Sequence, residues 1–473
     1  MSRTHRRPDR AAPRCLPGHY QAWAVAPLLI AITVLGRSSQ NVSQTTYPLV
    51  GHELLAMTNA TIGLVGAAAG VTGIAASALV VPRIPVQARL WMLAAGQALG
   101  AIAFIFFAAS RGQAELWAGA VILGAAGGIV FPLLMTVIGQ GRRGDRAKAL
   151  AVFALALSAS LVVGPLLEAG VLHLLDDSLR AAFAALLPLP VAATVFAVSA
   201  ALRSRPDDII DVDQVGSIRP RQDTALAERQ AIRPWTKQRA LPARGAPAAS
   251  AQERSGAHQE GATAHATQKG EDPEPSWGAE DASLSKHAFR IALLALLTYQ
   301  APFVALLTFG GLLGHHDDHA SATSVELAFG VFFTFSLGVR ILVTIRSPIR
   351  HTGRVLTGSV IATIVGVAVI GAAHGLVAFY VGMAILGAPH GVTLPVASSI
   401  LAENTSTWSL GRANGRLMAG TNVLTVAVPF ACGWLVQEVG YRPMFLFLEV
   451  PVVILGLLLF AQLARRPTTL ASG

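Results

Sequence analysis

Charged residues and cysteines are scarce in this sequence. Of its 473 residues only 13% are Asp, Glu, Lys or Arg, and its 2 cysteines are Cys15 and Cys432. Soluble domains carry roughly 25% charged residues, so this composition excludes an ordinary soluble globular protein. Two cysteines so far apart in the sequence predict no disulfide framework.

Familiar catalytic and nucleotide-binding motifs are also missing. The chain has no GxxxxGK[ST] loop to hold nucleotide phosphates, no HExxH zinc motif and no nucleophile elbow. We therefore expect neither ATP-driven transport nor an enzyme, with no cofactor and no bound metal. The formal charge of +10 would suit nucleic-acid binding. Because the cations lie where membrane topology would place them, we expect no nucleic-acid partner.

Apolar residues, in contrast, are abundant, since 53% of the chain is hydrophobic. They gather in twelve runs that can cross a bilayer core of roughly 30 Å, which takes about 20 helical residues. These runs cover residues 22–47, 60–81, 89–109, 116–139, 148–173, 181–202, 288–313, 324–345, 355–373, 376–401, 413–436 and 443–464. The sequence therefore predicts an all-α integral membrane protein with twelve transmembrane helices.

The polar segments between the runs divide the chain into domains. The predicted domains are a basic tail (1–21), a six-helix bundle (22–203), a linker (204–285), a second six-helix bundle (286–465) and a short tail (466–473). The linker is rich in Arg, Gln, Ala, Pro and Ser without apolar periodicity, so we predict it to be disordered. No small-residue cleavage site ends the first run, which favours a retained helix over a removed signal peptide.

The charges of the loops predict the orientation in the membrane. If the N-terminus is cytoplasmic, the outside loops carry only Arg111, Arg180 and Arg442. The short inside segments then carry 19 cations: Arg3, Arg6, Arg7, Arg10, Arg14, Arg83, Arg89, Arg142, Arg143, Arg146, Lys148, Arg340, Arg346, Arg350, Arg354, Arg412, Arg416, Arg465 and Arg466. Cytoplasmic loops carry an excess of Lys and Arg, so we expect both termini and the linker in the cytoplasm.

One apolar sequence occurs twice. Residues 122–132 read ILGAAGGIVFP and residues 385–395 read ILGAPHGVTLP, with six of eleven positions identical. The copies fall in the fourth run of each set of six, which favours two six-helix halves in parallel repeat. The alternative is a chance likeness between helices rich in Gly, Ala and Leu.

This organisation resembles the major facilitator superfamily, whose members have six plus six helices, cytoplasmic termini and a central cytoplasmic loop. In the fifth run, Gly164-Pro165 is similar to the glycine-proline motif of drug/proton antiporters, although Glu168-Ala169 replaces the paired glycines that follow it. The loops after the second and eighth runs keep basic residues and a glycine of the family's gating motif, without its acid. These residues are Arg83, Arg350, Gly353 and Arg354.

The resemblance covers all twelve runs and implies a cavity between the halves that opens alternately to either side of the membrane. Four glycines of the second run would form one small face suited to moving helix contacts, or to static tight packing. They are Gly63, Gly66, Gly70 and Gly73.

Arg37 is the strongest candidate for contact with a transported solute. It lies midway along the first run, where an arginine costs about 2.5–3.5 kcal/mol and usually faces a cavity or a partner. Gln40, Asn41 and Gln44 follow on the same helical face, which predicts a polar cavity wall for an anionic or hydroxylated solute. Alternatively, the first helix ends near Gly36 and Arg37 lies in an outside loop.

Glu168 is the candidate for proton coupling. A buried carboxylate favours its protonated form, and a nearby arginine favours the ionised form, so a pair with Arg37 would bind and release a proton. The alternative is a solvated carboxylate at the outer rim, which is also the favoured interpretation of Glu449.

Three residues of the second half complete the predicted solute site. His390 occupies the position of Gly127 in the repeat, and Tyr299 and Gln300 would face Gln40 across the cavity. A packing histidine is an equal alternative for His390. The acidic and histidine residues at 315–319 resemble a metal cluster, but a solvated turn is favoured.

The sequence as a whole predicts a secondary active transporter of a small solute, as a monomer in the plasma membrane of the bacterial inner-membrane type. Gly164-Pro165 favours proton-coupled export by an antiporter, whereas the polar stripe at Arg37 favours proton-coupled uptake of a sugar or organic acid. A membrane scaffold or sensor that docks through the linker is an alternative of another class.

Overall fold

The computed structural model describes residues 21–139, 143–204, 279–346, 351–404 and 407–465. Arg350 lies outside these ranges. So do residues 1–20 and 466–473 of the two predicted tails, and most of the predicted linker. Within the described ranges the chain is helical and contains no strand.

The first half contains six crossings. They are α1 (Gln21–Leu49), α2 (Asn59–Ala75), α3 (Arg89–Ala109), α4 (Gln113–Gly139), α5 (Arg143–Leu174), and α6 (Leu179–Leu186) with α7 (Pro188–Arg203). Short π or 3-10 helices extend or follow these helices. They are η2 (Val50–Leu54), η3 (Ala76–Val80), η4 (Val81–Arg83) and η5 (Val86–Ala88).

The second half repeats this plan. Its crossings are α10 (Ala279–Ala305) with η7 (Leu306–Gly310) and α11 (Gly311–His316), α12 (Ala322–Ile345), α13 (Thr352–Ala372), α14 (Leu376–Glu403), α15 (Thr407–Asn422) with α16 (Leu424–Val439), and α17 (Tyr441–Ala464). Each of the twelve predicted runs has a matching helix or pair of helices. The largest difference is at α10, which begins at residue 279 instead of 288; α5 and α15 begin five and six residues before their predicted runs.

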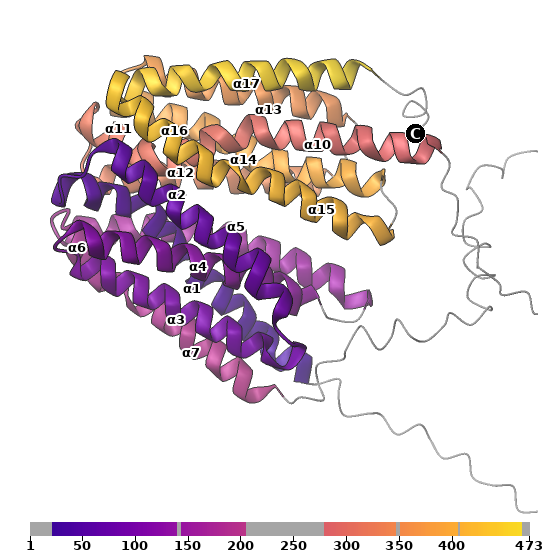
Figure 1. The fold of residues 1–473 in the computed structure, drawn as a ribbon, viewed down its shortest axis with the longest axis horizontal. Coiled ribbons are helices and arrows are strands. Elements are labelled where there is room, and N and C mark those ends of the chain that lie inside the picture. The colour runs from indigo at the N-terminus through magenta and orange to yellow at the C-terminus, as the bar shows by residue number, and fades with distance from the viewer. Residues whose placement is uncertain (1–20, 140–142, 205–278, 347–350, 405–406, 466–473) are drawn as a thin grey trace, which may run out of the picture. The chain divides into compact units, whose positions relative to one another are not determined.

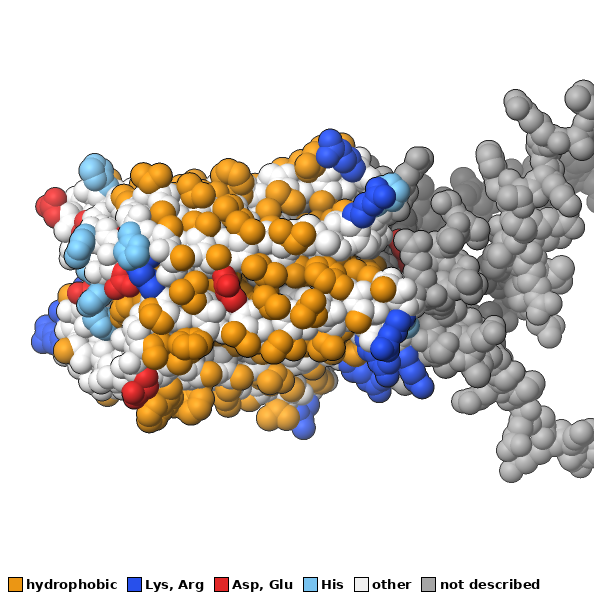
Figure 2. All heavy atoms as spheres, turned by 90° about the horizontal axis from the view of Figure 1, so that it is seen from above, with side chains coloured by type: hydrophobic (Ala, Val, Ile, Leu, Met, Phe, Trp, Pro, Cys, Tyr) orange, Lys and Arg blue, Asp and Glu red, His pale blue; other side chains and the backbone are white. Residues whose placement is uncertain are grey.

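The helices of the two halves lie side by side and run between two ends (Figure 1). We call the end at which α1 and α10 begin and α7 and α17 end the tail end. The opposite end carries the short loops after α1, α3, α5, α11, α13 and α16, and we call it the closed end. In Figure 2 an apolar band covers the face in view, and charged side chains gather at its two ends.

The apolar band is the surface expected of a protein that lies in lipid. Eleven helical segments among the described residues are long and apolar enough to cross a membrane. The twelfth crossing is α1, which has 29 residues but is polar in its second half. The predicted class, an all-α membrane protein with two six-helix bundles, is confirmed.

The repeated sequence makes the same packing contact in each half. Gly124 of α4 lies against the backbone carbonyl of Ala69 in α2, and Gly387 of α14 lies against that of Phe332 in α12. The residue numbers of the two contacts differ by the same 263 positions that separate the repeated sequences. Two more contacts repeat at this interval. Gly128 lies against Gly73 in the first half, as Gly391 lies against Ser336 in the second. Gly96 lies beside Val130 in the first half, as Ser359 lies beside Thr393 in the second. The repeat therefore specifies how three helices of each half approach one another.

Most of the predicted glycine face of α2 lies between the halves. Gly63 and Gly66 contact Pro429 of α16, and Gly70 contacts the carbonyl of Thr425. Gly73 instead lies against α4 of its own half. Because small residues let helix backbones approach closely, the face allows α2 and α16 to pack directly across the boundary between the halves.

Candidate functional site

Arg37 lies inside α1, so the alternative of a first helix that ends near Gly36 is wrong. Its side chain is partly exposed. The guanidinium donates to Gln40 Oε1 at 2.8 Å and lies 5.8 Å from the ring centre of Phe131 in α4. Gln40 in turn lies beside Gly127, which has no side chain to fill the space. This arrangement places a cation and an amide side by side between α1 and α4.

The polar stripe of α1 divides between two surroundings. Asn41 is buried and its amide donates to the carbonyl of Leu161 in α5 at 3.3 Å, so it joins two helices instead of facing a cavity. Gln44 is partly exposed and makes no hydrogen bond with the described residues. The structure therefore keeps Arg37 and Gln40 together and separates Asn41 from them.

His390 lies within a cluster of aromatic rings from the second half. Its ring centre is 4.5 Å from that of Phe303 and 5.3 Å from those of Tyr299 and Phe332. Both ring nitrogens of His390 and the Tyr299 hydroxyl are buried and have no hydrogen-bond partner among the described residues. Gln300 is partly exposed and lies outside the ring cluster.

Arg340 is a site residue that the sequence assigned to the cytoplasmic cations. It lies within α12, and its guanidinium crosses to the first half, where it donates to Ser158 Oγ of α5 at 2.7 Å. It also donates to the backbone carbonyl of His390 at 3.4 Å. Arg340 lies inside the predicted transmembrane run 324–345, and this position distinguishes it from the cations of the loops.

Glu168 is almost completely buried, at 1% exposure, and it faces a second buried carboxylate, Glu326 of α12. Thr46 of α1 donates to Glu168 Oε1, and its hydroxyl lies 3.4 Å from Glu326 Oε1. Thr45 lies 3.1 Å from Glu326 Oε2. The two acids come from different halves, so this cluster joins α1 and α5 of the first half to α12 of the second.

The expected pair between Glu168 and Arg37 does not form among the described residues, and that prediction is wrong. Thr46, the partner of Glu168, lies about 13 Å beyond Arg37 along α1, towards the closed end. The expectation of a solvated rim position for Glu168 is also wrong, since the side chain is buried. Glu326 was missed, although an acid inside an apolar run was the same signal that identified Glu168.

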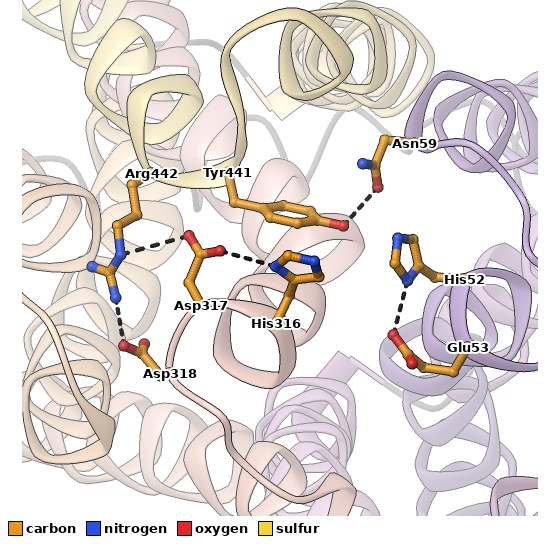
Figure 3. Close-up of polar contacts among 8 residues, drawn as sticks. All are labelled: His52, Glu53, Asn59, His316, Asp317, Asp318, Tyr441 and Arg442. Carbon is orange, nitrogen blue, oxygen red and sulfur yellow. Dashed lines mark hydrogen bonds and ion pairs between the residues drawn. The ribbon is translucent and has the colours of Figure 1, made fainter.

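A network of polar side chains joins the halves at the closed end (Figure 3). Tyr441 of α17 donates to Asn59 Oδ1 of α2 at 2.8 Å. Asp177, after α5, accepts from the backbone N–H of Thr323 at 2.8 Å and from its hydroxyl. The Nε2 atom of His315 lies 3.6 Å from a carboxylate oxygen of Glu53 in η2. Each contact links one half to the other.

Four of the acidic and histidine residues at 315–319, namely His315, His316, Asp317 and Asp318, take part in this network. Arg442 pairs with Asp317 and Asp318, and His316 lies 3.3 Å from Asp317 (Figure 3). Among the described residues, no group of three or more potential ligands is arranged to hold a metal ion.

The motif residues occupy helix contacts and loop positions. Gly164 brings α5 close to Ser38 of α1, and Pro165 follows it within α5. Arg83 is exposed at the end of η4 and donates to the carbonyl of Leu79. Gly353 and Arg354, the other described residues of the gating-motif loops, lie at the start of α13. Gly353 is partly buried and Arg354 is exposed.

Glu449, the remaining acid noted in the sequence, lies in α17. It is partly exposed, and its Oε1 atom is buried with no partner among the described residues.

Two helical bundles that meet around buried charged side chains define an all-α integral membrane protein. A family model described as Major Facilitator Superfamily matches residues 288–472, which span the second half. With the fold of the whole helical unit, this match supports a membrane transporter of the Major Facilitator Superfamily type.

Solved transporter structures share this fold at low sequence identity. The nucleoside transporter NupG is 14% identical with a TM-score of 0.63, and the alignment covers 93% of this chain and 100% of NupG. The peptide transporter POT in complex with sulfate is 13% identical, with a TM-score of 0.65 and coverage of 95% and 98%. An inward-facing, unoccupied bacterial homologue of the human lysosomal transporter Spinster is 12% identical, with a TM-score of 0.64 and coverage of 95% and 99%. No curated protein sequence matches this chain.

Proposed function

We propose that the protein is a proton-coupled transporter that exports a small solute by alternating access, and that Glu168 and Glu326 together carry the coupling proton. The observation that supports this most directly is the burial of two carboxylates, one from each half, against one another. Two negative charges side by side in a low-dielectric interior repel each other, so such a pair is stable when it holds a proton.

The surrounding hydroxyl groups support the same interpretation. Thr45 and Thr46 have one hydroxyl proton each, and Thr45 also lies within 3.2 Å of two backbone carbonyls. The Oε2 atom of Glu168 has no hydrogen-bond partner of its own among the described residues. The only titratable group that interacts with either carboxylate in the described residues is the other carboxylate. A shared proton is therefore the available means of stabilising the pair.

The position of the pair couples proton binding to the movement of the halves. Opening of the closed end would separate α5 from α12 at this level and expose both acids to water, where they ionise. Binding of a proton would favour closure, and its loss on the tail side would favour reopening. Proton movement through the pair would thus drive the halves between two arrangements.

The direction of solute transport depends on whether the Glu168–Glu326 pair is protonated when the solute crosses. If the solute crosses when the pair is deprotonated, the protein is an exporter that exchanges solute for protons. If both cross together, it is an uptake system. We favour export because Gly164-Pro165 resembles an antiporter motif and sits where α5 meets Ser38 of α1, four residues before Glu168.

The distribution of Lys and Arg supports the orientation proposed for this cycle. We infer that the tail end faces the cytoplasm of a plasma membrane and that the closed end faces outward. One polypeptide contains both halves and both acids, so we propose a monomer as the working unit. The part of the predicted linker 204–285 that precedes α10 is proposed to act as a tether between the halves.

Transport assays on purified protein in proteoliposomes test the proposal. Solutes from several classes, including nucleosides, peptides, sugars and organic acids, are offered with a pH gradient of either sign. Glu168→Gln and Glu326→Gln should each reduce gradient-driven transport by about tenfold or more while solute exchange persists. Glu438→Gln, an exposed acid on α16, is the matched control and should behave as the wild type.

Two outcomes would contradict the proposal. Undiminished driven transport in both glutamine variants would rule out the pair as the proton carrier. Solute movement in the same direction as the protons would keep the coupling but replace export with uptake.

A further inference from the structure

One arginine from each half lies beside the same segment of α5, at the boundary between the halves. Arg37 of the first half precedes Ser38, whose hydroxyl donates to the backbone carbonyl of Ser160 in α5 at 3.0 Å. Arg340 of the second half donates to the carbonyl of His390 and to Ser158 of the first half. Two arginines therefore lie beside one segment between the halves, inside the membrane-spanning part of the protein.

No acidic side chain balances this charge among the described residues. Neither Arg37 nor Arg340 takes part in any of the ion pairs formed there. The Nε atom of each arginine is buried without an acceptor. Glu168 and Glu326 are engaged with each other and with Thr45 and Thr46, closer to the closed end. Like charges left unpaired in a low-dielectric interior are costly, so the site lacks an anion.

The unused hydrogen-bonding groups at this point are mainly donors. Arginine has five N–H donors and no acceptor. The Tyr299 hydroxyl and the two nitrogens of His390 are also buried and free of partners in the described chain. A ligand that fits this set must supply acceptor oxygens and negative charge. Carboxylate and phosphate groups do both, and guanidinium binds them in a bidentate manner.

Apolar rings lie directly beside these donors. Phe303, Tyr299 and Phe332 surround His390 at ring-centre distances between 4.5 and 5.3 Å. On the other side, Phe131 lies beneath Arg37. Aromatic faces of this kind pack favourably against a planar or apolar body. The ligand should therefore carry its acidic group on a ring or a similar apolar frame.

We propose that the solute is an organic oxyanion, a carboxylate or phosphate on an aromatic or apolar body, held between Arg37 and Arg340 with its body against the rings around His390. The proposal rests on the transport function above and names its substrate class. Because each arginine belongs to a different half, a bound anion attracts both halves, whereas the empty site leaves two cations facing each other. Loading would thereby favour the arrangement in which the halves are close together.

Ligand-induced thermal stabilisation of the purified, detergent-solubilised protein tests the proposal without any proton gradient. The probes are benzoate and phenyl phosphate, with benzyl alcohol and benzylamine as their neutral and cationic counterparts and inorganic phosphate as an anion without a body. The wild type should be stabilised by at least one aromatic anion and not by its counterparts. Arg37→Gln and Arg340→Gln should each weaken this binding by about tenfold or more.

Two further variants serve as controls. Arg465→Gln removes an exposed arginine at the end of α17 and should bind as the wild type does. Arg37→Lys keeps the charge but loses the bidentate geometry, so its binding should lie between that of the wild type and that of Arg37→Gln. If a glutamine variant does not fold, arginine modification by phenylglyoxal in the wild type replaces it. The aromatic anion should then protect Arg37 and Arg340, but not Arg465.

The proposal is overturned if neutral and anionic probes stabilise the protein equally, if no probe anion binds, or if neither arginine is needed or protected. Stabilisation by inorganic phosphate equal to that by the aromatic anions would remove the role of the rings. The assay uses no pH gradient, so its outcome does not depend on proton coupling. Anion binding without proton-driven transport would refute the coupling alone, and driven transport of neutral solutes alone would refute the anion site alone.

Discussion

The contacts inside each half differ in kind from the contacts between the halves. Inside a half, helices touch through their backbones at glycines, and the same contacts recur in both halves, as with Gly128 on Gly73 and Gly391 on Ser336. Between the halves, the closed end relies on single hydrogen bonds such as that from Tyr441 to Asn59. Backbone packing of this kind has one arrangement, whereas side-chain bonds can be broken and replaced by water.

This difference indicates that each half moves as a rigid body and that the boundary between them is the moving part. One exception is the line of glycines on α2, which packs against α16 of the other half, and another is Gly330 of α12, which lies against Leu166 of α5. Close packing without interlocking side chains lets one helix slide or tilt on another. Substitutions inside a half should therefore affect folding, and substitutions at the boundary should affect the balance between conformations.

The largest effect is expected inside the halves, at Gly128 and Gly391. Leucine at either position would overlap the backbone of the neighbouring helix, and overpacking of this severity costs about 3 kcal/mol or more. Gly128→Leu and Gly391→Leu should each greatly reduce the yield of monodisperse protein, measured by size-exclusion chromatography. Gly100→Ala and Gly358→Ala are the controls, since a Cβ there meets no neighbour within 4 Å. Normal yield in both leucine variants would show that the halves are not rigid.

A smaller effect on folding but a clear one on conformation is expected at Gly63. Valine there would overlap the carbonyl of Pro429 when the closed end is shut. The open arrangement should therefore become more stable relative to the closed one by about 2 kcal/mol, which raises the ratio of open to closed protein by about thirtyfold. Spin labels at Ser178 and His374, exposed at the closed end of each half, should report a longer distance in Gly63→Val. Gly100→Ala should leave the distance unchanged. A wild-type distance in Gly63→Val would mean that α2 and α16 do not control the closed end.

The sequence was sufficient for the features that depend on helix content. Hydropathy located all twelve crossings to within a few residues in most cases, because lipid requires continuous apolar helices. The repeat was also visible, since the contacts of Gly124 and Gly387 require glycine at the same place in both halves. Arg37 was correctly placed inside a helix, because a first helix that ended near Gly36 would have left an outer loop longer than the other outer loops.

The partners of the buried charges were not predictable in the same way. Apolar residues surround these helices on most faces, so periodicity does not show which side faces a neighbour. Arg37 and Glu168 were each identified, but their pairing was wrong because a helix sequence does not give the depth of residues on another helix. Glu326 and Arg340 belong to the second half, and only the packed structure brings them to Glu168 and Ser158.

At the closed end, Asp177 should have a moderate effect on the balance between conformations. Its carboxylate accepts two hydrogen bonds from Thr323, and bonds to a charged acceptor contribute about 1.5–3 kcal/mol. Asp177→Gly removes both bonds without backbone strain, because the residue has a φ of 60°. The open population should rise by about tenfold, since partial exposure reduces the contribution to near the lower limit of that range. Distances between labels at Ser178 and His374 measure the change.

Asp176 supplies the matched control for this change. It also has a positive φ, of 48°, but it is exposed and forms no hydrogen bond or ion pair with the second half in the described residues. Asp176→Gly therefore introduces the same residue into the same turn without removing a bond between the halves. Equal opening in the two variants would attribute the effect to the turn and not to the bond with Thr323.

The smallest effect is expected at Tyr441, where one neutral hydrogen bond joins the halves. Tyr441→Phe removes the bond to Asn59, which contributes about 1 kcal/mol, so the open population should rise by about fivefold. Tyr380→Phe is the matched control, because that hydroxyl donates to the carbonyl of Ser324 inside the second half. The same label distances should change in Tyr441→Phe and stay constant in Tyr380→Phe. If both variants opened equally, hydrogen bonds inside a half would influence the boundary, and the rigid-body interpretation would be wrong.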